Sequence, residues 1–124
     1  MESFNYIQQA SESRCDFLTI YIKEAHAMDV WPDGYQFTRP IRTPRSKEER
    51  IIEANAFITE LGYELPMVCD TMDEEFLVKY SSWPIRIFII DEEGKLEYIQ
   101  EPTSAQVDTF ELIEILTKHK IILN

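Results

Sequence analysis

The chain has 124 residues, of which 44% are hydrophobic, and this length and composition fit one folded domain rather than two domains or a disordered chain. Lys and Arg number 12 and Asp and Glu number 23, which gives a formal net charge of −11. Such an acidic surface repels phosphate groups, and this argues against nucleic-acid binding and against docking on anionic lipid.

The two cysteines, Cys15 and Cys69, form neither a CxxC pair nor a disulfide framework, so a reducing compartment is the simpler interpretation. No apolar stretch approaches the roughly 18 residues that suggest a membrane-spanning helix. The first residues lack a signal-peptide pattern. No metal-ligand spacing or glycine-rich phosphate loop is visible, so no metal or bound cofactor is predicted. We expect these residues to behave as a soluble acidic domain, and the sequence leaves the compartment unknown.

The first elements are a short helix and a buried strand. Residues 2–14 predict an amphipathic helix, because Phe4 and Ile7 lie three positions apart among polar residues. Residues 17–22 are apolar or β-branched on both faces, which predicts a strand covered on both sides. A long loop follows over residues 27–45, and long loops inside compact domains are often functional.

The best-marked helix spans residues 46–61. Ser46 and Glu49 form a capping box, and Gly62 is placed to end the helix in the left-handed conformation. An apolar stripe at helical spacing supports the assignment: Ile51, Ala54, Ile58 and Leu61.

A short edge strand and a second short helix come next. Residues 65–69 are mostly apolar, and Pro66 is tolerated because an edge strand can lack one donor. Thr71 and Glu74 form a second capping box, which predicts a helix over residues 71–80.

The chain closes with a hairpin and a helix. Residues 85–90 are the strongest strand, residues 91–94 form a turn, and residues 95–99 return antiparallel. The last helix is expected to open at residues 102–104. Its apolar stripe comprises Val107, Phe110, Leu112, Ile113, Ile115 and Leu116.

Strands that alternate with helices imply right-handed crossovers and a mainly parallel sheet. The closing hairpin adds an antiparallel edge. The sequence therefore predicts an α/β fold with a thioredoxin-like mixed sheet flanked by helices, over a single domain of residues 1–124.

Two motifs carry a family resemblance. The run Asp-Phe-Leu-Thr-Ile-Tyr-Ile-Lys-Glu-Ala-His ends at His26 and continues to Asp-Val-Trp at Trp31. The second motif is Trp-Pro-Ile-Arg-Ile-Phe-Ile-Ile-Asp over residues 83–91. Together they resemble the iodothyronine deiodinases, in which a selenolate or thiolate removes iodine reductively and a thiol reductant resets the enzyme. The resemblance implies a small-molecule substrate, either iodothyronine-like or another halogenated compound or peroxide.

In that family the selenocysteine or cysteine nucleophile ends a central strand just before the first helix. No such residue is present here, so the resemblance implies that the domain is N-terminally incomplete. The missing strand would lie between the strands at residues 17–22 and 85–90. Without it, we expect the chain to be marginally stable, to aggregate, or to pair those two strands directly. A membrane tether is expected only if a missing N-terminus supplies it, and a homodimer is an open alternative.

The resemblance assigns roles to five residues. Glu24 and His26 are the catalytic candidates, for proton handling and for contact with the substrate phenol, and histidine suits this work because its pKa lies near neutrality. Trp31 and Arg86 are the substrate-binding candidates, although an ion pair with a carboxylate would equally explain Arg86. Pro84 matches the cis-proline beside the nucleophile of thioredoxin folds, against the simpler role of ending a helix.

Other functions stay open. Neither Cys15 nor Cys69 begins a helix after a strand, so both are poor candidates for the nucleophile. Lys23 stands where a glutamate is usual in the family. A non-catalytic thioredoxin-like binding domain and a peroxiredoxin-like thiol peroxidase or reductase fragment are the two alternatives to a deiodinase-like oxidoreductase.

Overall fold

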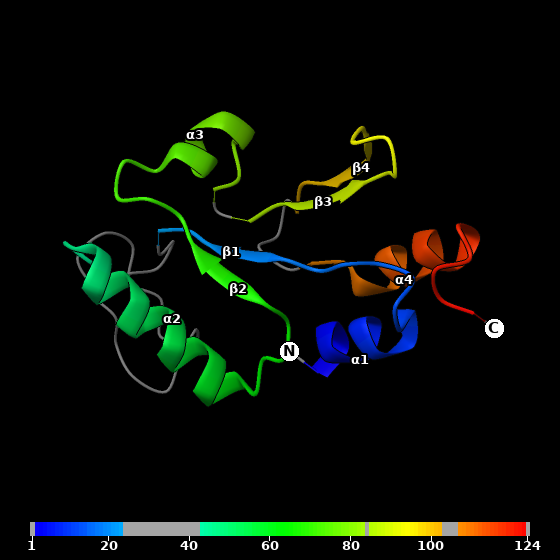
Figure 1. Cartoon of the computed structure of the whole chain (residues 1–124), viewed down its shortest axis with the longest axis horizontal. Helices are drawn as coiled ribbons and strands as arrows, with labels where there is room; N and C mark the ends of the chain where they lie inside the picture. Colours follow the sequence, from blue (N-terminus) through cyan, green and yellow to red (C-terminus); the bar gives the residue numbers. More distant parts are fainter. Residues whose placement is uncertain (1, 24–42, 84, 103–106, 124) are drawn as a thin grey trace.

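The structure is a computed structural model, which describes residues 2–23, 43–83, 85–102 and 107–123 (Figure 1). Helices and strands alternate along these residues until a closing strand–strand–helix unit. The helices are α1 (Glu2–Ser11), α2 (Lys47–Leu61), α3 (Glu75–Tyr80) and α4 (Thr109–Lys118). The strands are β1 (Thr19–Tyr21), β2 (Met67–Cys69), β3 (Ile87–Ile90) and β4 (Leu96–Gln100). This mixed α/β arrangement confirms the predicted fold class.

The strands of the described residues form two small sheets of opposite character. β1 and β2 pair in parallel, with Thr19 opposite Met67, and α2 is the crossover between them. β3 and β4 pair antiparallel as a hairpin, with Ile87 opposite Gln100. In Figure 1, β1 lies between β2 and β3, and β3 runs in the opposite direction to β1. β1 and β3 do not pair with each other, so direct pairing, one of the three expected outcomes, is wrong, while marginal stability and aggregation stay predictions.

One core packs the hairpin against helices from the two ends of the chain. Ile7 of α1 is fully buried against Leu112 and Leu116 of α4. Ile87 and Ile89 of β3 pack against this cluster. The core explains why β3 stays with the terminal helices: its inward side chains are already covered on one face by α1 and α4.

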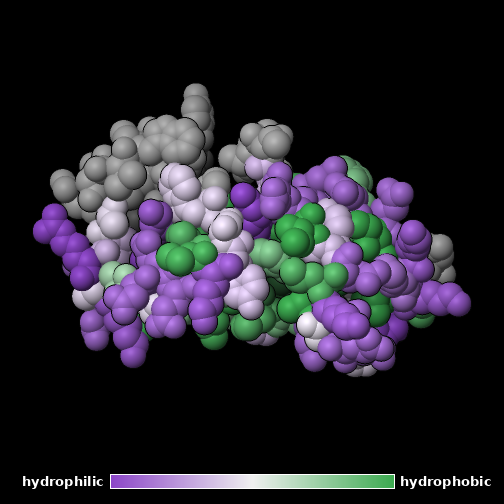
Figure 2. Space-filling model, turned by 90° about the horizontal axis from the view of Figure 1, so that it is seen from above, coloured by the Kyte–Doolittle hydropathy of each residue, from purple (hydrophilic) through white to green (hydrophobic). Residues whose placement is uncertain are grey.

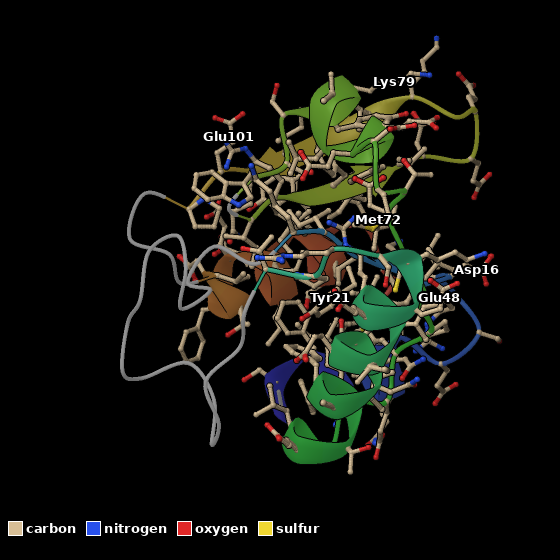
Figure 3. The ribbon with its side chains drawn as sticks, turned by 90° about the vertical axis from the view of Figure 1, so that its left-hand side faces the viewer. Asp16, Tyr21, Glu48, Met72, Lys79 and Glu101 are labelled. Atoms are coloured by element: carbon tan, nitrogen blue, oxygen red, sulfur yellow. The ribbon has the colours of Figure 1, made fainter. Side chains whose placement is uncertain are left out.

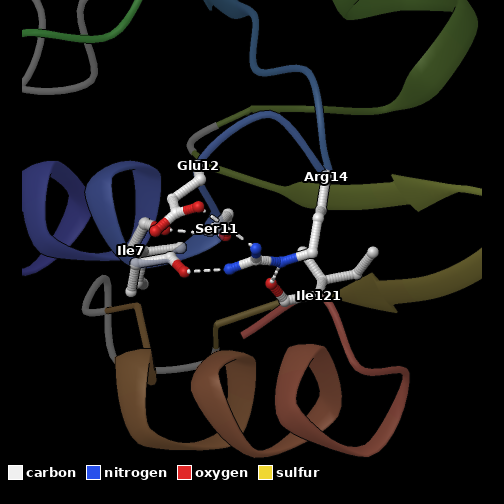
Figure 4. Close-up of polar contacts among 6 residues, drawn as sticks. Ile7, Ser11, Glu12, Arg14 and Ile121 are labelled. Atoms are coloured by element: carbon white, nitrogen blue, oxygen red, sulfur yellow. Dashed lines mark hydrogen bonds and ion pairs between the residues drawn. The ribbon is translucent and has the colours of Figure 1, made fainter. Parts of the chain in front are cut away.

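Arg14 joins the chain ends next to this core (Figure 4). Its Nε donates to the carbonyl oxygen of Ile121 at 2.7 Å, and its Nη2 donates to the carbonyl oxygen of Ala10 at 2.9 Å. Ser11, also buried, donates through Oγ to the carbonyl oxygen of Ile7 at 2.7 Å. The bond to Ala10 satisfies a carbonyl group in the last turn of α1 that has no partner within the helix, and the bond to Ile121 ties this turn to the segment after α4.

The caps of α2 confirm its predicted bounds. Ser46 Oγ accepts from the Glu49 N–H at 3.1 Å, and Gly62 ends the helix at φ 61°. The Glu49 carboxylate accepts from the Arg45 N–H rather than from Ser46. A side chain in place of hydrogen at Gly62 would be strained at this φ, which is why glycine fits the position.

The buried face of α2 differs from the predicted stripe. Ala54 is buried as expected, but Ile51 and Leu61 are exposed. Arg50 is instead only 2% exposed, and its Nη1 donates to the carbonyl oxygens of Asp70 and Thr71 at 3.2 and 2.8 Å. The cationic side chain therefore takes an interior place because it satisfies backbone carbonyls at the corner between β2 and α3.

That corner also corrects the second predicted capping box. Thr71 does not begin the helix: residues 71–74 form a turn, and α3 starts at Glu75. The buried Asp70 carboxylate accepts from the N–H groups of Phe76 and Leu77 at 2.9 and 3.1 Å. Asp70 thus shares the capping of α3 with Thr71, whose Oγ1 accepts from the Glu75 N–H at 3.2 Å, because the turn brings Asp70 back over the helix start.

The last helix also starts later than expected. Asp108 caps α4 by accepting from the Glu111 N–H at 3.0 Å, so the expected helix start at residues 102–104 is wrong. Leu112 and Leu116 are buried as predicted, whereas Phe110 is 84% exposed. Phe110 lies in the first turn of α4, and the stripe that packs on β3 begins only with Leu112.

Apolar side chains also reach the surface over α3 and the hairpin. Figure 2 shows this face, with hydrophobic residues between hydrophilic ones. Val78 of α3, Ile90 of β3 and Leu96 of β4 are among the exposed large hydrophobic residues. The strongest predicted strand is consequently not a fully buried one: no residue of β3 falls in the buried class.

Candidate active site

The predicted site segments meet where β1 ends and the residues before β3 begin. Lys23 follows β1 by two residues, and its Nζ lies 5.1 Å from the centroid of the Trp83 ring. A cation at this distance over an indole face is attracted by the ring quadrupole. The contact brings the C-terminal end of β1 against the segment that leads into β3. α/β proteins place their sites at the C-terminal ends of strands.

Arg86 lies next to this contact in sequence, immediately before β3. Its Nη1 donates to the carbonyl oxygen of Ile85 at 2.8 Å. Its Nε lies 3.7 Å from Oε1 of Glu101, and the two side chains are 19% and 65% exposed. Figure 3 views the molecule from the side on which β1 ends, with Glu101 above Tyr21. The ion pair expected as the simpler role of Arg86 is therefore present, but its distance exceeds that of a hydrogen bond.

Three buried polar atoms of this segment have no hydrogen-bond partner: Ser82 Oγ, Trp83 Nε1 and Arg86 Nε. A buried donor without an acceptor costs about 1–3 kcal/mol, and native proteins contain few such groups. These three atoms lie within residues 82–86, so this short segment has several buried polar groups that lack a hydrogen-bond partner in the described chain.

Glu24, His26, Trp31 and Pro84 lie outside the described residues. Their roles therefore stay predictions. Lys23 and Trp83, which contact each other, are the immediate neighbours of Glu24 and Pro84. Sequence reasoning used Trp83 only as part of a motif and Lys23 only as a departure from the family. The signal for both was their position directly beside the predicted site residues.

Neither cysteine has the properties of an activated nucleophile. Burial raises the pKa of the Cys15 thiol, and the neighbouring Asp16 carboxylate raises it further. Burial also raises the pKa of the Cys69 thiol, although the positive charge of Arg50 acts in the opposite direction. Since the thiolate is the reactive species, both thiols are less reactive than an ordinary cysteine at neutral pH. This agrees with their predicted status as poor nucleophiles.

A separate groove of about 510 Å³ lies between α2 and β2. Its lining is mainly apolar and includes Ile51, Ile58, Met67, Val68, Cys69 and Met72. Arg86, the one predicted site residue within the described ranges, does not line this groove. Across the described ranges, no three His, Cys, Asp or Glu side chains gather in a way that would hold a metal ion. No helix in those ranges has the length and apolar character needed to cross a membrane.

The parallel β–α–β unit, the closing β-hairpin–helix unit and the meeting of their ends define a thioredoxin-like α/β protein. Comparison with family models matches iodothyronine deiodinase over residues 1–120, and this chain belongs to that family. The chain is 37% identical over 95 residues to the type I iodothyronine deiodinase of Xenopus laevis, a match that covers 77% of this chain and 36% of that protein. It is 30% identical over 89 residues to the type II iodothyronine deiodinase of Petromyzon marinus, covering 68% of this chain and 29% of that protein. The chain thus spans about a third of the length of these curated relatives.

Proposed function

We propose that this chain is the larger part of the catalytic domain of a deiodinase-like oxidoreductase, which removes iodine reductively from an iodothyronine-like phenol. Family membership over residues 1–120 is the observation that carries this proposal. The contact between Lys23 and Trp83 supports it, because it joins the two segments that hold the predicted site residues.

The proposed chemistry uses a selenolate or thiolate from residues outside this chain. The chalcogen attacks iodine, a selenium–iodine or sulfur–iodine bond forms, and the carbon–iodine bond breaks, with the electron pair left on the ring carbon. A proton then reaches that carbon. Two equivalents of thiol release iodide, restore the chalcogen and form one disulfide, so that the aryl iodide is reduced and the thiols are oxidised. The raised pKa values of both described thiols explain why neither is assigned this attack.

The proposed roles within the chain follow the predicted residues. His26 and Glu24 handle the proton and engage the substrate phenol, because imidazole exchanges protons near neutral pH. Trp31 contributes an aromatic surface, and Arg86 binds the acid end of the substrate. Replacing Glu101 with a substrate carboxylate would give Arg86 a closer partner than its present ion pair at 3.7 Å.

We further propose that one additional strand, from residues outside this chain, pairs with both β1 and β3 and completes one mixed sheet. In the described part, β1 pairs only with β2, and β3 pairs only with β4. Both strands are apolar, yet β3 has no residue in the buried class. A strand between them would satisfy their free backbone groups, since buried backbone N–H and C=O groups are almost always paired.

The test is iodide release by the longer polypeptide, obtained by extending the transcript upstream of the codon for Met1. With a dithiol present, we expect iodide release from an iodothyronine and loss of that activity in His26→Ala. His119→Ala is the matched control, since His119 lies at the end of α4 and pairs with Glu97 at 3.2 Å. Turnover of hydrogen peroxide without iodide release would favour the peroxiredoxin-like alternative. Inactivity of the extended protein in both assays would favour the binding domain.

A further inference from the structure

One cationic side chain contacts Trp83, and a second follows three residues later in sequence, in a chain that is otherwise strongly acidic. Lys23 Nζ lies over the indole ring, and Arg86 follows Trp83 by three residues. The formal net charge of the chain is −11. At physiological ionic strength, charges are screened beyond about 8 Å, so a ligand bound beside Trp83 interacts mainly with charges in its immediate surroundings. Lys23 places a positive charge there, directly over the indole ring.

The carboxylates of the described residues leave much of this positive charge available. None of them lies within ion-pair distance of Lys23 Nζ. Glu101 approaches Arg86 only to 3.7 Å and is 65% exposed. Because Glu101 is exposed and its contact with Arg86 is longer than a hydrogen bond, a ligand carboxylate that approaches Arg86 more closely can replace it.

In addition to the positive charge of Lys23, Trp83 offers a surface on which an aromatic ring of a ligand can stack. The indole face carries Lys23, so a ligand ring stacked at its edge would have the lysine ammonium within a few ångströms. At that distance the Lys23 ammonium repels an ammonium group on the ligand and attracts a ligand carboxylate. The sign of the charge next to the ligand ring is consequently set by Lys23.

We propose that Lys23 over Trp83 makes this site selective for aromatic acids without an ammonium group, in preference to the corresponding zwitterionic amino acids. This inference rests on the proposed function, because it takes the same site as the place where substrate binds. It adds a specificity-determining pair, Lys23 and Trp83, to the binding role proposed for Arg86.

The test is calorimetric titration of the 124-residue chain with three iodinated phenols of the same ring. They are a diiodinated hydroxyphenylacetate, the corresponding tyrosine and the corresponding tyramine. We expect the acid to bind about tenfold more tightly than the tyrosine, and the tyramine to bind most weakly. Lys23→Glu should reduce the preference for the acid to less than about twofold, and Lys23→Arg should retain it.

Two further variants separate the local charge from other effects. Lys23→Met keeps a long side chain against Trp83 without the charge, so its preference should fall between those of the wild type and Lys23→Glu. Lys95→Glu is the control for net charge, because Lys95 lies beside the hairpin turn and pairs with Glu93 at 3.6 Å. It should leave the preference unchanged.

Equal affinity for the acid and the tyrosine overturns the inference, as does equal loss of preference in Lys23→Glu and Lys95→Glu. Absence of binding by all three phenols overturns it as well. The proposed function is tested separately and fails if the longer polypeptide releases no iodide. If the titration shows the charge preference but the longer polypeptide releases no iodide, the selective site is supported and the proposed deiodination is refuted.

Discussion

The Asp70 carboxylate offers the sharpest test of how this fold is held together. It is buried and accepts three backbone N–H groups: those of Thr71, Phe76 and Leu77, at 2.9, 2.9 and 3.1 Å. Oδ1 accepts the first two and Oδ2 accepts the third. Asp70→Ala removes both acceptor oxygens and all three hydrogen bonds, and it leaves the N–H groups of Phe76 and Leu77 in α3 without these partners.

The expected cost follows from these contacts. An N-cap aspartate is worth about 1 kcal/mol, and hydrogen bonds to a buried charged group raise the loss in Asp70→Ala to about 3 kcal/mol. For a chain of this size, that lowers Tm by about 10 °C. Asp70→Asn retains one oxygen for two N–H groups and should cost about 1.5 kcal/mol. Thr71→Ala loses one exposed bond, from the Glu75 N–H at 3.2 Å, and should cost about 0.5 kcal/mol.

Thermal unfolding by circular dichroism measures the order of the three variants. Hydrogen exchange adds a local readout, since the amides of Phe76 and Leu77 should lose protection in Asp70→Ala before the rest of α3. The reasoning is refuted if Thr71→Ala destabilises the chain more than Asp70→Ala. That result would restore the capping box expected from the sequence.

Three further predictions concern packing, backbone conformation and thiol reactivity. Phe110→Ser should change the free energy of unfolding by less than about 0.5 kcal/mol, while Leu112→Ala should cost about 2–5 kcal/mol, both measured by urea denaturation; comparable losses would contradict the exposed position of Phe110. Gly62→Ala should cost about 1 kcal/mol, measured in the same way, because the residue sits at φ 61°; an unchanged midpoint would contradict the left-handed cap. Cys15 and Cys69 should react with iodoacetamide at pH 7 more slowly than a cysteine in a model peptide, because their raised pKa values lower the thiolate fraction. Mass spectrometry measures both rates, which should rise with pH. Faster reaction at either cysteine would be incompatible with its burial.

Local sequence signals predicted most of the elements. Ser46 and Gly62 mark the two ends of α2 because capping depends on residues within one turn of the helix end. The same signal gave the wrong helix start at Thr71, where a turn allows Asp70 to reach the first N–H groups of α3. Apolar periodicity gave the wrong side for Phe110, because packing decides which face of α4 covers β3. Arg50 was also missed, because a buried arginine is stabilised by the Asp70 and Thr71 carbonyls 20 and 21 residues away.

The candidate site also combines features that local sequence motifs predicted with a contact that only the structure shows. The motifs that end at His26 and begin at Trp83 indicated the family, and comparison over residues 1–120 shows it. The contact between Lys23 and Trp83 joins residues about sixty positions apart, so no local pattern predicted it. The catalytic roles of Glu24 and His26 stay predictions until iodide release is measured in the longer polypeptide.

The sequence by itself determined the order of the elements, the caps of α2, the α/β class and the family resemblance, since all of these depend on neighbouring residues and their periodicity. Tertiary structure alone decided that β1 and β3 belong to separate sheets in this chain, that Asp70 as well as Thr71 caps α3, and that Lys23 lies over Trp83. These features depend on side chains and backbone groups far apart in sequence. Their positions follow from how α1 and α4 pack on the hairpin and how α2 connects the parallel strands.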